Sequence, residues 1–484
     1  MTQLEQEMDG PAANAAATRA HRQWPGDQRQ EGRRLGLRRP SRGLVTAVVA
    51  VAVVAVIAPA RAAGIGPDPL WWLEAAVAAV TAIYLAVILF KLLMICFGSA
   101  ETARLDAPGV LPALREQDGL PQYTVLAPLS GPDITDGQSD RLIADLTALD
   151  YPASRLEVLL LVAADRERPA EPLPDHFTVV SVGSADPHQA YAAGLARAGG
   201  ELCVGYRPGQ RPDAGQLRAS AAAFRQLPNW VVSVQAPMRC QNPDLNWLSQ
   251  CIAAEQSVHS ALLLRGLDKF RLVLPFGGAS AHFRTDALRQ LEAWQADDPH
   301  GDADLGTRIA RRGWSVRMLA SVTTEEADGR LGPWLGDRAA SFRDGYRNWR
   351  AQVRSSYRLW RNLGPARFAA LQLTSALGIC TALVNPLLWL LTVAWLVGGS
   401  GGPVVGVFPL PELYVVVAAM LLGNVLTAYS LMIGCMEQGM FPAVRTMFLA
   451  PAYWALTSMA AYRALLPSQR PTPAPAMVPS IAAS

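Results

Sequence analysis

The sequence has 484 residues, of which 51% are hydrophobic and only 17% are charged, and its mean hydropathy is positive. Charged residues average about a quarter of a soluble domain, so this composition argues against an ordinary soluble enzyme. The formal net charge of +3 is too small to indicate a nucleic-acid-binding protein. Six cysteines without a C-x-x-C pair indicate neither a disulfide framework nor a zinc site.

The N-terminal part begins with residues 1–42, which are rich in Ala, Gln, Gly and Arg, and we expect a disordered basic region there. Residues 43–98 hold apolar runs at 44–58 and 70–97. We expect two transmembrane helices, since about 20 apolar residues span a bilayer. The first run is short and precedes Ala60-Arg61-Ala62, which also looks like a signal-peptide cleavage site. Both interpretations leave the next domain on the Arg-rich, cytoplasmic side.

Between residues 120 and 335, short apolar runs alternate with helical stretches. Runs 123–129, 156–162, 177–182, 202–206 and 230–235 are typical of strands covered on both faces. Helices predicted at 138–149, 188–198 and 214–226 would complete βαβ units. We therefore expect a Rossmann-like α/β domain with a parallel sheet, inserted between membrane helices. Its ligand should bind at the carboxyl ends of the strands, just after residues 129, 162 and 206.

Residues 336–366 predict an amphipathic helix with adjacent aromatic and arginine faces. The pattern favours a helix in the membrane interface, with rings at the headgroup level and guanidinium groups near phosphates. The alternative is a solvated helix that packs its rings on the domain. The aromatic residues are Phe342, Tyr346, Trp349, Tyr357 and Trp360, and the arginines are Arg343, Arg347, Arg350, Arg354, Arg358 and Arg361.

Residues 367–466 predict three or four further transmembrane helices, from apolar runs at 368–397, 413–435 and 446–466. Asn385-Pro386 interrupts the first run, which could be one tilted helix or a broken pair. Residues 467–484 are rich in Pro and Ala, and we expect a disordered tail.

Five sequence motifs, in order between residues 123 and 371, resemble those of membrane-bound family-2 glycosyltransferases, the group that includes cellulose-synthase-like enzymes with a GT-A fold. The motifs are Asp150-Tyr151-Pro152 with Arg155-Leu156-Glu157-Val158; Gly194-Leu195-Ala196-Arg197-Ala198; Gly277-Gly278-Ala279-Ser280 with His282-Phe283-Arg284-Thr285-Asp286; Asp302-Ala303-Asp304-Leu305-Gly306; and Arg311-Arg312-Gly313. The resemblance implies inverting transfer of a hexose from a nucleotide sugar, of the UDP-sugar type, during polysaccharide or glycolipid synthesis. It also implies an inner-membrane protein with its GT-A domain in the cytosol.

The resemblance places Asp302 at the position of the general base that accepts the acceptor's hydroxyl proton. An alternative is that Asp302 and Asp304 simply open a helix, where carboxylates favour the helix dipole. The residues that would line the acceptor site are Gly277, Gly278, His282, Asp304 and Arg338.

Several residues depart from the family pattern. The D-x-D segment that holds a divalent metal reads Arg207 and Gln210 at its acidic positions, so no metal is expected by that route. A Mg²⁺ or Mn²⁺ cofactor is possible only if the chain is an active enzyme. Arg207 and Arg211 could instead contact the donor's diphosphate, and Asp165 could bind the nucleotide base or be a solvated loop residue. The closing motif Q-x-x-R-W reads Asp337-Arg338-Ala339-Ala340-Ser341.

Two functional hypotheses remain open, and the ordered motifs disfavour a third, a transporter with an unrelated α/β domain. One is a membrane glycosyltransferase whose donor-site chemistry is weakened or lost. The other is a non-catalytic relative that acts as a scaffold or partner in a polysaccharide synthesis or export complex. The expected partners are the lipid bilayer, the nucleotide sugar of an active enzyme, and polysaccharide export proteins.

Overall fold

The computed structural model describes residues 69–105, 119–129, 136–164, 172–183, 186–275, 280–294, 302–399 and 410–466. All of them belong to one compact unit, Val45–Ser484. The predicted basic region at 1–42, the apolar run at 44–58 and the tail at 467–484 lie outside the described residues.

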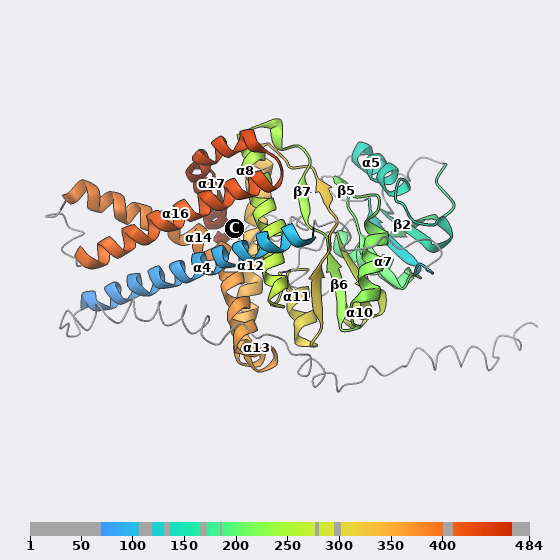
Figure 1. The fold of residues 1–484 in the computed structure, drawn as a ribbon, viewed down its shortest axis with the longest axis horizontal. Coiled ribbons are helices and arrows are strands. Elements are labelled where there is room, and N and C mark those ends of the chain that lie inside the picture. The colour runs from blue at the N-terminus through green and yellow to red at the C-terminus, as the bar shows by residue number, and fades with distance from the viewer. Residues whose placement is uncertain are drawn as a thin grey trace, which may run out of the picture. The chain divides into compact units, whose positions relative to one another are not determined.

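A seven-stranded sheet forms the centre of the α/β domain, in the order β3-β2-β1-β4-β8-β6-β9. Its strands β2 and β6 are labelled in Figure 1. Its strands are β1 (Tyr123–Pro128), β2 (Leu156–Ala163), β3 (Phe177–Val182), β4 (Leu202–Gly205), β6 (Val231–Gln235), β8 (Ala281–Arg284) and β9 (Ser315–Met318). The five predicted strands are confirmed to within two residues. The sheet is mixed rather than wholly parallel, because β8 runs antiparallel to both β4 and β6.

Helices cover both faces of this sheet, since alternate residues of its strands enter different cores. Val125 packs with α5 (Asp136–Thr147) and α7 (Gln216–Gln226). Leu126 packs with α6 (Pro187–Arg197), α10 (Thr285–Gln290) and α11 (Asp302–Arg311) on the other face. Burying each large apolar side chain contributes about 1.5–3 kcal/mol, which explains the nearly continuous apolar strands.

A second, three-stranded sheet has the order β5-β10-β7. Its strands are β5 (Gln210–Pro212), β7 (Met238–Cys240) and β10 (Thr323–Glu325). Each strand has only three residues, too few for a recognisable apolar pattern, and none was predicted. This sheet joins the chain just after β4 to the chain just before α12 (Leu331–Arg354), so it brings distant parts of the sequence together.

A helical segment between β7 and β8 connects the α/β domain to the apolar helices. It consists of α8 (Trp247–Ser257), a π-helical turn η4 (Val258–Leu263) and α9 (Leu264–Lys269). It contacts α4 (Pro69–Leu105) and α16 (Leu410–Glu437). The approach to α4 is close at Gly98 and Gly266, where an added Cβ would lie 1.8 Å and 2.0 Å from the carbonyl oxygens of Leu262 and Met94.

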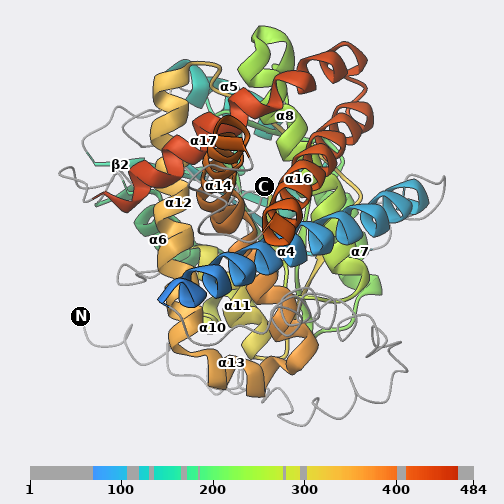
Figure 2. The ribbon, with the colours of Figure 1, turned by 90° about the vertical axis from the view of Figure 1, so that its left-hand side faces the viewer.

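Three helices in the described part of the chain are long and apolar enough to cross a membrane: Glu74–Ala100 in α4, Gly378–Gly398 in α14 (Pro365–Gly398) and Leu413–Glu437 in α16 (Figure 2). The run with Pro386 forms one helix, not a broken pair. Asn385 and Asn424 exchange two amide hydrogen bonds of 3.0 and 3.1 Å between α14 and α16. The last predicted span, at 446–466, corresponds to part of η6 (Phe441–Leu449) and the 16-residue α17 (Ala450–Leu465), and it remains a prediction.

The predicted amphipathic segment forms two helices, α12 and α13 (Ser356–Leu363). Its aromatic residues divide between them. Phe342 is buried against α17, and the Tyr346 hydroxyl donates to the Ala461 carbonyl. Tyr357 and Trp360 are exposed on α13. The first half of the segment therefore packs on another helix, whereas the second half presents rings at the surface, where the membrane-interface location remains a prediction.

Candidate functional site

The carboxyl ends of β1 and β4 are adjacent in the sheet, and the chain leaves β4 through Tyr206 and Arg207. The Arg207 guanidinium lies 3.7 Å from the Glu325 carboxylate of β10, and both side chains are mostly buried. Gln210 donates to the same carboxylate oxygen at 3.0 Å and accepts a bond from the Arg207 backbone N–H. Arg207 and Gln210 are therefore both engaged with one carboxylate from another strand.

Burial raises the pKa of Glu325, while Arg207 and Gln210 act in the opposite direction. No three His, Cys, Asp or Glu side chains in the described ranges are grouped so that they could hold a metal ion. Sequence reasoning missed Glu325. An acidic residue at the end of a short polar run gives no local signal, and its partner Arg207 is more than 100 residues away.

A buried hydrogen-bond network lies in the core beside the carboxyl ends of β1 and β4. Gln216 accepts a bond of 2.6 Å from Tyr206 and lies 3.3 Å from Nε2 of His282. The other ring nitrogen of His282 lies 2.5 Å from the Tyr123 hydroxyl, which also contacts Ser220 at 2.7 Å. Because the Gln216 oxygen can only accept, Nε2 carries the proton and Nδ1 accepts from Tyr123.

His282 is fully buried, and burial lowers its pKa to about 3, so the ring is neutral near pH 7. The side chain lies inside the core, and its role in lining an acceptor site remains a prediction. Its neighbours Ser280 and Thr323 bond to each other and to Gln216. The network thus fixes β4, β8 and β10 relative to one another.

Arg338 lies away from this edge. Its guanidinium is 2.5 Å from Glu255 of α8, and the Tyr453 hydroxyl of α17 donates to the other Glu255 oxygen. Lys91 of α4 is also buried near this pair and interacts with both charges. Arg338 therefore joins α12 to α8 and α17, and sequence reasoning missed Glu255 because nothing local marks it.

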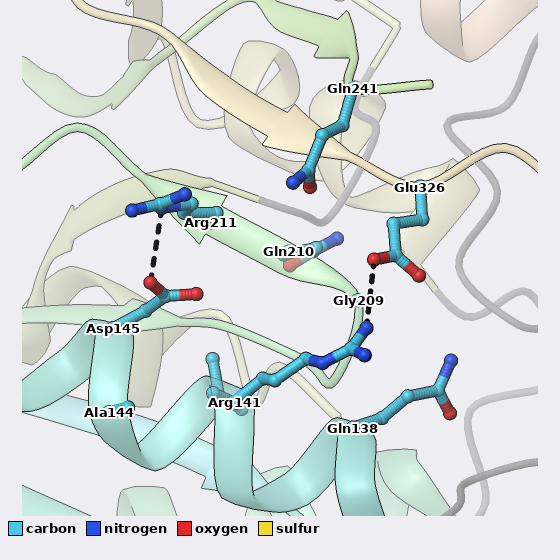
Figure 3. Close-up of a pocket in the computed structure, with 10 residues that line it drawn as sticks. Gln138, Arg141, Ala144, Asp145, Gly209, Gln210, Arg211, Gln241 and Glu326 are labelled. Carbon is cyan, nitrogen blue, oxygen red and sulfur yellow. Dashed lines mark hydrogen bonds and ion pairs between the residues drawn. The ribbon is translucent and has the colours of Figure 1, made fainter. Parts of the chain in front are cut away.

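Arg211, the neighbour of Gln210, points toward α5 and forms an ion pair of 3.1 Å with Asp145. A second pair of 3.3 Å joins Arg141 of α5 to Glu326. These four charged residues line a pocket of about 270 Å³ together with Gln138 and Gln241 (Figure 3). Arg207 and Arg211, predicted to act together on a diphosphate, thus have separate partners on different elements.

The structure describes only some of the remaining predicted site residues. Asp302 and Asp304 lie in the first turn of α11, where the alternative interpretation as helix-start carboxylates also places them, and the general-base role of Asp302 remains a prediction. Asp165, Gly277 and Gly278 lie outside the described residues. The six cysteines of the chain are free, in agreement with the absence of a disulfide framework.

A family profile described as "Glycosyl transferase family group 2" matches residues 211–461, which is more than half of the chain. No curated protein sequence matches it. Among solved structures, the chain is similar to the mannosyltransferase PcManGT from Pyrobaculum calidifontis, in complex with GDP-Man and Mn²⁺. That match has 16% identity and a TM-score of 0.44, and it covers 81% of this chain and 97% of that one. The TarS 1–349 fragment of S. aureus matches with 10% identity and a TM-score of 0.34, over 69% and 92%.

Proposed function

The chain belongs to glycosyl transferase family group 2, with an α/β domain of the GT-A fold, and we propose that it serves the synthesis of a cell-surface polysaccharide or glycolipid at a membrane. Its donor-site chemistry is weakened or lost. The observation that carries this proposal is the engagement of Arg207 and Gln210 with Glu325, at the place where family members have metal-binding carboxylates.

The residues present at this edge do not fit a divalent metal. Hard cations take oxygen ligands, usually with at least one carboxylate. Here an arginine repels the cation, and the Glu325 carboxylate already forms an ion pair with Arg207 and accepts a hydrogen bond from Gln210. Arg207 supplies one fixed positive charge, which could contact the diphosphate of a nucleotide sugar once it leaves Glu325. That contact would orient a donor without supplying the full stabilisation of a departing diphosphate.

Asp302 is the proposed general base. The resemblance of Asp302-Ala303-Asp304-Leu305-Gly306 to the family motif that contains the base supports the proposal. The first turn of α11 is the place that the alternative, a helix-start carboxylate, predicts for Asp302. A base at this position would accept the proton of the acceptor hydroxyl as the new glycosidic bond forms. Transfer would then depend on this carboxylate even if the donor is held weakly.

The alternative function is a non-catalytic scaffold in a polysaccharide synthesis or export complex. Arg338, in the register of the missing closing motif, supports it. The side chain is buried in an ion pair with Glu255 and is thus engaged in helix packing. A residue held in this way is poorly placed to close over a donor and an acceptor.

We place the protein in the inner membrane, with the α/β domain in the cytosol. Three candidate spans and the basic residues before residue 43 support this location. The exposed Tyr357 and Trp360 of α13 would lie at the lipid headgroups.

A comparison of Asp302→Asn with deletion of the whole chain tests the function. Asparagine keeps the size of aspartate and removes the base, so an active enzyme should lose glycan output as completely as in the deletion strain. If donor chemistry is lost and the chain is a scaffold, the point variant should retain output while the deletion lowers it. Unchanged output after deletion would contradict a role in glycan synthesis altogether.

A further inference from the structure

The pocket between α5 and the three-stranded sheet lies on the opposite side of that sheet from the Arg207–Glu325 pair. Neighbouring residues of a strand point to opposite faces. In β5, Gln210 bonds to Glu325, whereas Arg211 reaches Asp145 of α5. The pocket touches the same turn, through Gly209 and Gln210, but opens on the α5 side (Figure 3).

The charged groups of this pocket balance one another. Two arginines and two carboxylates line it, and they form the pairs Arg211–Asp145 and Arg141–Glu326. A phosphate could bind one of the arginines only by displacing its carboxylate partner. A cation could bind one of the carboxylates only by displacing its arginine partner. The lining therefore favours a ligand with no net charge.

The same lining is rich in groups that both donate and accept hydrogen bonds. The arginine guanidinium groups supply donors and the carboxylates supply acceptors. The side-chain amides of Gln138 and Gln241 each have two N–H donors and one carbonyl acceptor as well. Adjacent hydroxyls on a sugar ring both donate and accept hydrogen bonds, so they can pair with these neighbouring donors and acceptors. The volume of about 270 Å³ is just below the usual range of about 300–1,000 Å³ for drug-sized ligands. This size suits a short saccharide unit rather than a lipid chain or a whole nucleotide sugar.

We propose that this pocket binds a neutral saccharide unit of the glycan that the protein helps to make. The proposal rests on the function proposed above and adds a glycan-binding site outside the donor edge. Because pocket and edge share the Gly209–Gln210 turn, a glycan held there would stay close to the donor edge between steps of assembly.

The test uses the full-length chain, purified in detergent, and a panel of neutral tetrasaccharides of glucose, galactose, mannose and N-acetylglucosamine. Binding is followed by saturation-transfer NMR and titration calorimetry. At least one tetrasaccharide should bind, and Arg141→Ala combined with Gln241→Ala should weaken it at least about tenfold. Both side chains are exposed, so the fold should tolerate the change.

Arg347→Ala is the matched control, since Arg347 is also an exposed arginine with an ion pair of 3.2 Å but lies on α12. It should leave saccharide binding unchanged. Inorganic phosphate at millimolar concentration should not displace the saccharide. Displacement by phosphate, equal effects of the control and pocket variants, or no binding across the panel would overturn the pocket proposal.

The two proposals fail in different ways. If no saccharide binds but deletion of the chain still lowers glycan output, the pocket proposal falls alone. If deletion leaves glycan output unchanged, the proposed function falls, whatever the pocket binds.

Discussion

Arg338 of α12 and Glu255 of α8 form a buried ion pair, with 2.5 Å between the guanidinium nitrogen and the carboxylate oxygen. Each side chain is only 3% exposed, and Tyr453 of α17 donates to the second carboxylate oxygen. Burial opposes the charged form of Arg338, while Glu255 raises its pKa, so the guanidinium stays protonated. The pair ties the helix that follows the α/β domain to the helices beside the candidate spans.

Removing one member of this pair should be strongly destabilising. Arg338→Ala leaves the Glu255 carboxylate buried without its cation, which typically costs about 3–5 kcal/mol. Arg347→Ala, on the same helix but with its ion pair exposed, should cost less than about 1 kcal/mol. Thermal unfolding of the purified variants in detergent checks this. Similar losses for both would show that the buried pair does not hold these helices together.

The close crossing of α4 and α9 gives a second stability prediction. A Cβ at residue 266 would lie 2.0 Å from the Met94 carbonyl oxygen, so Gly266→Ala must push the two helices apart. Overpacking of this kind typically costs about 1–3 kcal/mol. Gly336→Ala, in α12 with nothing within 4 Å of the added carbon, should be neutral or stabilising by up to about 1 kcal/mol. A melting temperature equally unaffected in both variants would contradict the close contact.

The burial of His282 predicts acid sensitivity. Its folded pKa of about 3 lies below the ordinary value of 6.5, so the neutral ring is favoured in the fold. The resulting stability is fully present above pH 6.5 and is lost as pH falls toward 3, by about 2 kcal/mol at pH 5. His259, whose pKa is lowered to about 4, acts in the same direction.

His282→Gln should remove the share of this acid sensitivity that His282 contributes. The difference in apparent stability between pH 7.5 and pH 5 should shrink by about 2 kcal/mol relative to the unmodified chain. An unchanged pH profile would mean that His282 is not the group that titrates.

The Arg207–Glu325 pair predicts opposite effects of two substitutions on nucleotide binding. Arg207→Ala should weaken UDP binding, because it removes the positive charge proposed to meet the diphosphate. Glu325→Gln should strengthen it several-fold, by about 1 kcal/mol, because Arg207 loses its competing carboxylate. Arg218→Ala, a similarly buried arginine paired with Asp150, is the control and should have no effect. Unaltered binding in Arg207→Ala would remove Arg207 from the donor site.

The sequence predicts the strands and helices of this fold well where burial is uniform. β1, β2, β4 and β6 are recognisable because both of their faces are covered, which requires continuous apolar runs. β3 is an edge strand with Thr178 and Ser181 exposed, and its apolar residues still mark it. The four-residue strands β8 and β9 were not predicted, and the antiparallel direction of β8 depends on pairing between distant segments. The small sheet was missed because three residues are too few to show a period of two.

Only the site residues that local sequence motifs mark could be predicted, and not their distant partners. The replacement of acids by Arg207 and Gln210 is visible in the sequence, but their shared partner Glu325 is not. Likewise, the motif predicts Arg338 as a residue that lines the acceptor site, but its ion pair with Glu255, 83 residues away in the sequence, has no local signal. Ion pairs between distant residues are fixed by tertiary packing, which single-sequence patterns do not report.

The proposed function requires a donor edge that has no carboxylate–metal site and retains one arginine. Calorimetric titration of the full-length chain with UDP, in Mn²⁺ and again in EDTA, tests it most directly. We expect any UDP affinity to differ by less than about twofold between the two conditions, since Arg207 and Gln210 offer no carboxylate to a cation. Binding that is at least about tenfold tighter in Mn²⁺ would contradict it and would require metal ligands elsewhere in the chain.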